Sequence, residues 1–232
     1  MAAALAAAGT DVLSSLAGRV RNPRLPEGPV RIGGFGGPDG LAASLRAEGI
    51  TAVVDATHPF AAGITANAVQ ATAQLGIPLL ILRRPGWDAD PSWHVVAGTG
   101  EAAAKVRDWP GEAVFLTTGR RDLAVFAADD AHRFLVRTVD PPEGPAPKRM
   151  TLILDRGPYT VEGETALMRE HGTGLLVTKD SGGSMTAAKL QAARDLGVQV
   201  VMVARPPLPD GAAVVATVPE AVEWVSEGNG AA

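Results

Sequence analysis

Short, almost continuous apolar segments alternate with alanine-rich segments along most of the chain. The apolar segments are rich in Val, Ile and Leu and lack an in–out alternation, which predicts strands that are covered on both faces. They lie at residues 11–15, 30–34, 51–56, 78–83, 93–96, 113–118, 133–138, 175–179 and 199–204. Segments with helical spacing lie between them, at residues 38–48, 60–75, 99–108, 161–171 and 185–196. This order predicts an α/β protein whose parallel sheets are built from right-handed strand–helix–strand units.

Breaks in this pattern predict two Rossmann-like lobes with a cleft between them. The segment DWPGE at residues 108–112 separates a finished helix from a new strand. We therefore expect an N-terminal, cofactor-binding lobe at residues 1–97, a connecting segment at 98–111 and a C-terminal lobe at 112–232. The proline-rich stretch 140–149 is interpreted as a loop that crosses the cleft.

Composition excludes several classes of protein. Hydrophobic residues make up 46% of the chain, yet no segment approaches the ~20 uninterrupted apolar residues of a membrane span. The absence of cysteine excludes disulfides, thiolate catalysis and Cys-ligated metals, and the four scattered histidines make a metal site improbable. A net charge of −4 argues against a general nucleic-acid binder. We expect a cytoplasmic monomer that binds neither nucleic acid nor membrane.

Arginines at the ends of predicted strands indicate an anionic ligand. Ligands of open parallel sheets bind outside the carboxyl ends of the strands, where guanidinium groups suit carboxylates and phosphates. The alternative is that these arginines only decorate exposed loops. They are Arg19, Arg83, Arg84, Arg120, Arg121, Arg137 and Arg205.

Two strand ends in the N-terminal half suit the phosphates of a dinucleotide. After the first strand, Ser14, Ser15 and Arg19 stand where NAD-binding folds carry an acidic residue, and they would suit a 2′-phosphate instead. An ordinary turn with a solvated arginine is the alternative. The glycine-rich segment Gly33–Gly40 lies between a strand and a helix, so its backbone could approach a phosphate, although it is not a GxGxxG fingerprint.

A third strand end, Asp55–Ala61, carries the sequence DATHPFA. We expect Thr57 to cap a helix that Pro59 opens, which would bring His58 and Phe60 to the cleft. A contact with cofactor or substrate is the preferred interpretation of His58, and a role as proton donor is the alternative.

Polar loops also follow two strands of the C-terminal half. In Val177–Gly183, Lys179 could bind a carboxylate or phosphate, Ser181 could cap a helix, and the two glycines permit a close approach. The order of a nucleotide-hydrolysing P-loop is lacking. The segment LTTGRR at residues 116–121 repeats the same design.

Ordered motifs throughout residues 14–209 resemble the precorrin-6A reductase family. They read SLAGR, PRLP, VRIGGFGG, DATHPFA, RPGW, FLTTGR, VRTVDPP, DRGPY, VTKDSGG and RPPLP. The resemblance implies a two-lobed reductase that transfers a hydride from NADPH to the precorrin-6A macrocycle in cobalamin biosynthesis, giving precorrin-6B. It also implies a ligand for the arginines at the strand ends, because precorrins carry many acetate and propionate carboxylates.

The resemblance and the strand-end analysis together give a set of candidate site residues. Candidate proton donors are Asp180 and His58, with water as the alternative. Candidate cofactor-binding residues are Ser14, Ser15, Arg19, Gly34, Phe35, Gly36, Thr57, His58, Pro59 and Phe60. Candidate substrate-binding residues are Arg84, Thr118, Gly119, Arg120, Arg137, Lys179, Ser181, Gly182 and Gly183.

The chain departs from the family pattern in two places. Family members usually open with a strand and a loop reading roughly GGTxEA, whereas this chain opens with MAAALAAAGTD. We expect a start codon assigned too late; loss of part of the cofactor site is the alternative. The family also commonly carries Asn at the position of Asp180, so Asp180 adds a negative charge near an anionic substrate.

Two other functions stay open. One is the same reduction driven by NADH on the cobalt-containing precursor, against which the absence of an acidic residue after Ser15 argues. The other is a two-lobed protein that binds a tetrapyrrole without reducing it.

Overall fold

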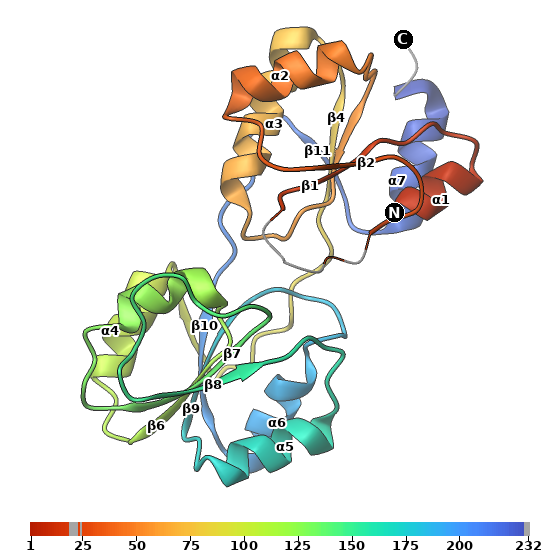
Figure 1. The fold of residues 1–232 in the computed structure, drawn as a ribbon. Coiled ribbons are helices and arrows are strands. Elements are labelled where there is room, and N and C mark those ends of the chain that lie inside the picture. Colours follow the sequence, from red (N-terminus) through yellow and green to blue (C-terminus); the bar gives the residue numbers. More distant parts are fainter. Residues whose placement is uncertain (19–22, 24, 230–232) are drawn as a thin grey trace. The chain divides into compact units, whose positions relative to one another are not determined.

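A computed structural model describes residues 1–18, 23 and 25–229. The chain forms two compact units, one of Met1–Pro85 with Pro206–Ala232 and one of Gly86–Arg205 (Figure 1). We call them the N-terminal and the C-terminal unit. The chain therefore passes between the units twice, after Pro85 and after Arg205.

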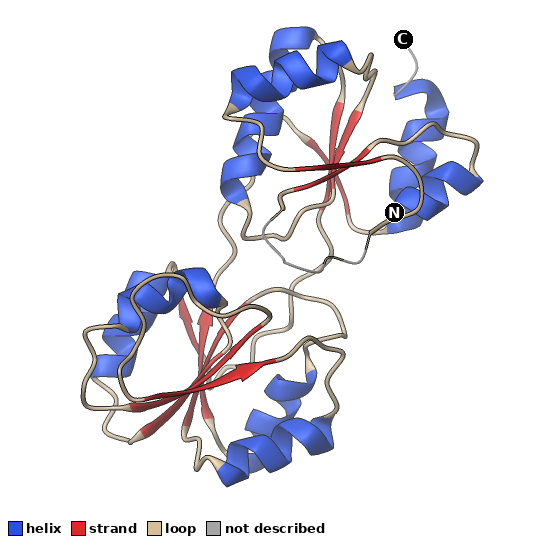
Figure 2. Ribbon diagram, in the orientation of Figure 1, coloured by secondary structure: helices blue, strands red, loops and turns tan. Residues whose placement is uncertain are grey.

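The N-terminal unit contains two parallel sheets. β1 (Ser14–Leu16) pairs with β2 (Val30–Ile32), and a second sheet has the order β11 (Ala213–Val215), β4 (Leu79–Leu82), β3 (Val53–Asp55). Helices α2 (Pro38–Ala47) and α3 (Ala62–Leu75) lie on one side of the strands, and α1 (Ala2–Ala7) and α7 (Val218–Trp224) on the other (Figure 2). A π-helical turn, Val225–Asn229, follows α7.

The C-terminal unit is built on one six-stranded parallel sheet. Its order is β5 (His94–Val96), β10 (Gln199–Val203), β9 (Leu175–Lys179), β6 (Ala113–Leu116), β7 (Arg133–Thr138), β8 (Met150–Leu154). Helix α4 (Thr99–Arg107) covers one face, and α5 (Val161–Glu170) and α6 (Ala188–Leu196) cover the other (Figure 2). A 3-10 helix, η1 (Arg120–Phe126), follows β6.

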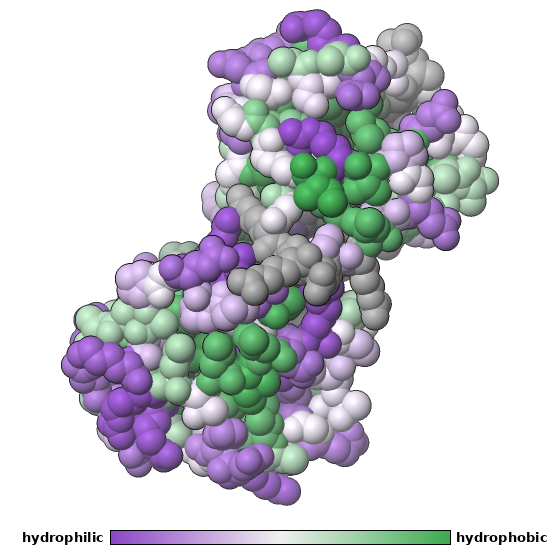
Figure 3. Space-filling view, in the orientation of Figure 1, coloured by the Kyte–Doolittle hydropathy of each residue, from purple (hydrophilic) through white to green (hydrophobic). Residues whose placement is uncertain are grey.

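Burial follows the position of each strand in its sheet. The side chains of the central strands β6 and β9 are almost wholly buried, in a core that includes Phe115, Leu176 and Met168. The edge strand β8 is half-exposed, with Leu154 among its exposed side chains. An apolar patch lies on this face of the unit (Figure 3). In the N-terminal unit Ile32, at the end of β2, is 55% exposed.

The structure confirms the predicted α/β class with parallel sheets. The predicted strands are all present, and β7 and β9 have the predicted bounds. Six elements of the described residues were not predicted: α1, β8, η1, β11, α7 and the π-helical turn after α7. Each is short or half-exposed, so its apolar pattern is weak. Among the described residues, no helix is long and apolar enough to cross a membrane.

The boundary between the units differs from the predicted one. Residues 93–96 form β5, which pairs with β10 of the C-terminal unit, and residues 99–107 form α4, which packs against β5 and β10. Residues 206–232 return to the N-terminal unit, where β11 pairs with β4. The DWPGE segment is therefore a turn between α4 and β6 within the C-terminal unit. Trp109 of this segment stacks on His132.

This packing of Trp109 predicts opposite effects of two glycine substitutions. A Cβ added at Gly111 would lie 2.2 Å from the Trp109 ring, which is also held beside Gly174 and His132. We expect Gly111→Ala to lower the free energy of unfolding by about 1–3 kcal/mol in urea titrations. Gly100→Ala is the control, because Gly100 lies in α4 with open space around its Cα; it should be neutral or stabilise by up to about 1 kcal/mol. Equal stability of the two variants would contradict this packing.

Candidate functional site

The glycine-rich loop of the N-terminal unit is held by an arginine of the strand before it. Arg31, in β2, donates from its two terminal nitrogens to the carbonyls of Gly33 (2.8 Å) and Gly34 (2.7 Å), and its guanidinium lies 3.9 Å from the centre of the Phe35 ring. In a trans peptide the N–H points away from the carbonyl. The amides of Gly34 and Phe35 therefore point away from Arg31, as donors for an anion would.

The start of α2 adds further donors beside this loop. Gly36 and Gly37 have φ of 77° and 108°, conformations that favour glycine. Pro38 opens the helix, and no side chain caps it. A Cβ at Gly40 would lie 1.8 Å from the Phe35 carbonyl oxygen, so glycine is needed there for the loop to fold back on the helix. This geometry suits a phosphate.

The DATHPFA segment is organised by Asp55 rather than by the expected cap. Asp55 ends β3, is buried, and accepts hydrogen bonds from the Thr57 amide (2.9 Å) and the Thr65 hydroxyl (2.5 Å). The helix begins at Ala62, later than predicted, and Thr57 does not cap it. The prediction failed because the buried carboxylate binds the Thr57 amide and keeps residues 57–61 outside the helix.

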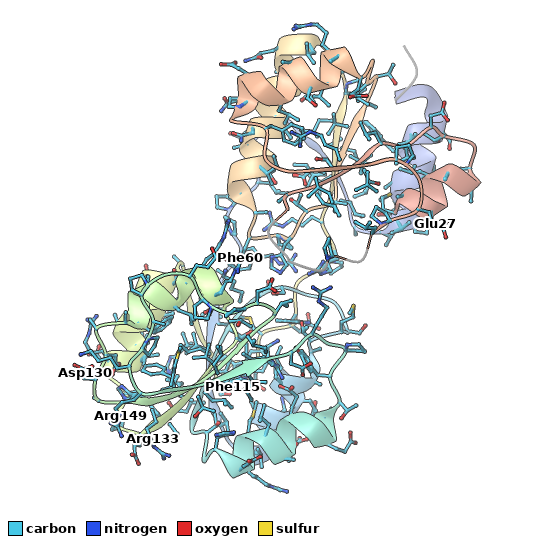
Figure 4. All side chains as sticks on the ribbon, in the orientation of Figure 1. Glu27, Phe60, Phe115, Asp130, Arg133 and Arg149 are labelled. Atoms are coloured by element: carbon cyan, nitrogen blue, oxygen red, sulfur yellow. The ribbon has the colours of Figure 1, made fainter. Side chains whose placement is uncertain are left out.

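His58 and its neighbours lie at the surface in front of α3. The Nδ1 atom of His58 accepts a hydrogen bond from the Phe60 amide (3.2 Å), so the proton of the neutral ring is on Nε2. Figure 4 marks Phe60, which precedes the helix. A cavity of about 20 Å³, lined by residues that include Asp55, Thr57, His58 and Pro59, lies beside it and has room for a single water.

The remaining cofactor candidates lie elsewhere in the N-terminal unit. Ser14 and Ser15 are in β1 itself rather than after it, and Gly34, Phe35 and Gly36 are in the loop described above. Arg19 lies outside the described residues.

In the C-terminal unit most of the substrate candidates meet at one edge of the sheet. Because its six strands are parallel, their carboxyl ends share that edge. Thr118, Gly119 and Arg120 follow β6, Arg137 is in β7, and Lys179, Ser181, Gly182 and Gly183 end or follow β9. Arg84 differs, since it belongs to the N-terminal unit.

Several cations at this edge already have carboxylate partners. Arg120 is paired with Glu143 at 2.9 Å, and Lys179 is paired with Asp122. Asp180 is paired with Arg205 at 3.1 Å, and its other oxygen accepts from the Trp87 amide at 2.9 Å. Arg121 and Arg156 differ. Both are exposed, and their guanidinium groups form no hydrogen bond or ion pair within the described part of the chain.

Arg137 is a buried structural cation rather than an exposed one. Its guanidinium makes a bidentate pair with Glu164 in α5 and lies 3.7 Å from the centre of the Tyr159 ring. Arg137 and Glu164 are 7% and 2% exposed. The predicted position at a strand end is correct, but the guanidinium is neutralised from within the unit.

Lys189, which the sequence analysis did not select, is buried beside this pair. Its ammonium nitrogen donates to the Thr186 carbonyl at 2.6 Å and lies 4.6 Å from the Trp87 ring. Burial, helped by the Arg137 charge and opposed by that of Glu164, lowers its pKa from 10.5 to about 7. The sequence carries one signal of this burial: Lys189 lies on the same face of the predicted helix as the apolar Ala193.

Other charged side chains lie at the opposite end of this sheet. Arg133 and Arg149 share Glu112, and Lys148 pairs with Asp130, at the amino ends of β7 and β8 (Figure 4). A cavity of about 260 Å³ lies there. We do not assign it as the reaction site, because ligands of parallel sheets bind at the carboxyl ends. Among the described residues no cluster of His, Asp and Glu could hold a metal ion.

The pKa of Lys189 predicts a particular dependence of stability on pH. The unfolded chain binds the lysine proton up to about pH 10.4, whereas the folded chain releases it above about pH 7, so stability should rise between these values. Lys189→Met removes this penalty. We expect it to be more stable than the parent by about 1–4 kcal/mol at pH 7, with the difference vanishing near pH 10. Urea titrations across this range measure it.

The control is Lys148→Met, because Lys148 is 74% exposed. It should leave the slope of stability against pH unchanged. A parallel shift of the Lys189→Met curve at every pH would contradict a neutral buried lysine.

Comparison with known proteins finds a matching family, curated relatives and a similar solved structure. The family described as precorrin-6x reductase CbiJ/CobK matches residues 1–226. A precorrin-6A reductase of Rhodococcus erythropolis is 54% identical over 228 residues, 97% of this chain and 92% of that protein. One of Mycobacterium tuberculosis (strain CDC 1551 / Oshkosh) is 55% identical over 218 residues, 93% and 88% of the two chains. A solved structure of CobK precorrin-6A reductase superimposes with a TM-score of 0.89 at 41% identity, covering 97% of this chain and 90% of that one.

Proposed function

Because this chain belongs to the precorrin-6x reductase CbiJ/CobK family, we propose that it reduces precorrin-6A to precorrin-6B with NADPH in cobalamin biosynthesis. The observation that carries the proposal is the family match along almost the whole chain, which includes both units. A C=C bond of the macrocycle would gain a hydride at one carbon and a proton at the other.

The N-terminal unit would bind the dinucleotide. The Gly33–Gly37 loop and the uncapped start of α2 offer backbone N–H groups, and the glycines leave open space where a side chain would stand. These features suit the phosphates of NADPH. Bound NADPH supplies the hydride, and the residues of the chain serve to hold and orient it. Arg31 contributes by holding the loop carbonyls away from the phosphates.

The C-terminal unit would bind the anionic macrocycle at the carboxyl edge of its sheet. We propose Arg121 and Arg156 as the first contacts for its acetate and propionate groups, because both are exposed and follow β6 and β8 there. Lys179 and Arg120 could join by exchanging Asp122 and Glu143 for substrate carboxylates. Thr118, Gly119, Ser181, Gly182 and Gly183 line the same edge.

The proton requires a separate source. His58 could donate from Nε2 as an imidazolium, in which a second proton on Nδ1 replaces the hydrogen bond from the Phe60 amide. Asp180 is a weaker candidate, because both of its oxygens are engaged within the unit. We therefore propose His58 or water as the donor.

The test of the proposed function is a turnover assay of the purified chain with precorrin-6A. We expect the absorbance of NADPH to fall only when the macrocycle is present, with one NADPH consumed for each macrocycle reduced. Consumption of NADH in preference to NADPH would favour the cobalt-precorrin reaction. Binding of the macrocycle without consumption of either nucleotide would indicate a tetrapyrrole-binding protein.

The glycine-rich loop yields a prediction for cofactor binding. Gly40→Ala places a methyl group against the Phe35 carbonyl and should displace the loop, so we expect at least about tenfold weaker NADPH binding by calorimetry. Gly63→Ala in α3 is the control, because a Cβ there meets nothing within 4 Å. Unchanged affinity in Gly40→Ala would remove the loop from the cofactor site.

Arg19 yields a prediction for cofactor choice. A guanidinium bound to the 2′-phosphate acts on NADPH alone, since NADH lacks this group. We expect Arg19→Ala to weaken NADPH binding by about tenfold to hundredfold and to leave NADH binding unchanged. An equal loss for both nucleotides would mean that Arg19 does not read the 2′-phosphate.

A further inference from the structure

The C-terminal unit begins at Gly86 and ends at Arg205, and both ends meet the same carboxylate. Oδ1 of Asp180 accepts the Trp87 amide hydrogen at 2.9 Å, and Oδ2 lies 3.1 Å from Nε of Arg205. The backbone of Asp180 takes part as well. Its carbonyl accepts from the same Arg205 nitrogen at 2.8 Å, and its amide donates to Val203 at 2.9 Å.

These contacts are protected from solvent and closely packed. The side chains of Asp180 and Arg205 are 19% and 10% exposed. A Cβ added at Gly86 would lie 2.5 Å from Oδ2 of Asp180, so the chain at residue 86 runs directly against the carboxylate. The Trp87 indole donates to the Gly183 carbonyl at 2.8 Å, which fastens the same segment to the loop after β9 a second time.

We propose that Asp180 is a positioning residue that fastens both chain crossings between the units to the carboxyl end of β9. The two crossings lie more than 100 residues apart in the sequence. Their attachment to one side chain gives them a common fixed point on the C-terminal unit. In the N-terminal unit Arg83 ties the same two segments together, because it donates to the Pro206 carbonyl at 2.9 Å.

A common fixed point matters for a reaction between two bound molecules. Hydride transfer needs the donor and acceptor carbons at close and defined distance, and a misplacement of about 1 Å can cost about a hundredfold in rate. This consequence for turnover rests on the proposed function; the attachment itself does not. Asp180 would act through the backbone it holds, and not by giving a proton to the substrate.

The first test compares Asp180→Ala with Asp180→Asn by hydrogen–deuterium exchange of the peptide that contains Trp87. Asn keeps an oxygen for the Trp87 amide and leaves the backbone carbonyl for Arg205, whereas Ala keeps only the carbonyl. We expect exchange at Trp87 to be at least about tenfold faster in Asp180→Ala and within about threefold of the parent in Asp180→Asn. Asp88→Ala removes a neighbouring exposed carboxylate and is the matched control, with exchange unchanged.

Gly86→Ala covers the case in which Asp180→Ala does not fold. The added methyl group displaces the carboxylate without removing it, so exchange at Trp87 should again be faster. Unchanged exchange in both Asp180→Ala and Gly86→Ala, or in Gly86→Ala alone when the other does not fold, would overturn the proposal.

Turnover separates positioning from proton donation. Positioning predicts that Asp180→Ala loses about tenfold to hundredfold in kcat/KM and that Asp180→Asn recovers most of this loss. An Asp180→Asn variant as inactive as Asp180→Ala, with Trp87 still protected, would overturn the proposal in favour of a carboxyl acid. If the parent chain consumes no NADPH with precorrin-6A, the proposed function fails, and the exchange experiment still decides the attachment.

Discussion

The parallel direction of all strands in the C-terminal unit is the constraint on which its candidate site depends. Parallel pairing sends every strand's carboxyl end to one edge, so segments more than 60 residues apart, after β6 and β9, come together there. It also requires helices on both faces of the sheet, which buries the strands and confines polar side chains to the ends. The loops after β6, β7 and β9 can therefore vary in chemistry while the sheet holds them in place.

Charge inside this unit is kept close to neutral. Arg137 and Glu164 cancel each other where both are buried, whereas the buried Lys189 ammonium beside them contacts the Thr186 carbonyl and the Trp87 ring. Because its pKa is lowered to about 7, Lys189 makes the interior of this unit sensitive to pH. The exposed cations Arg121 and Arg156 lie where water can solvate them, which is the state that an incoming carboxylate can replace. The buried Arg137 therefore pairs within the unit, whereas the exposed arginines are open to an incoming carboxylate. The sequence alone does not distinguish the two kinds.

Sequence alone predicted the parts of the fold that depend on local pattern. Strands β7 and β9 were predicted with their observed bounds, because each contains an uninterrupted apolar run, Phe134–Val136 and Leu175–Val177, that is buried in the sheet. It did not predict which strand pairs with which, so β5 was placed in the wrong unit and β11 was missed. At the candidate site the loops were located, but partners distant in sequence were not: Glu164 for Arg137 and Arg205 for Asp180. Such partners are set by the tertiary fold and leave no local signal.

The path of the chain between the units has a consequence for synthesis on the ribosome. The C-terminal unit is contiguous from Gly86 to Arg205, so it can complete its six-stranded sheet as soon as that segment has emerged. The N-terminal unit, although it begins first, lacks β11 and α7 until the last part of the chain is released. The usual order, in which the first domain made is the first to fold, is therefore reversed. Until then β4 lacks the strand that pairs with this edge, and an unpaired edge of this kind can pair with another chain.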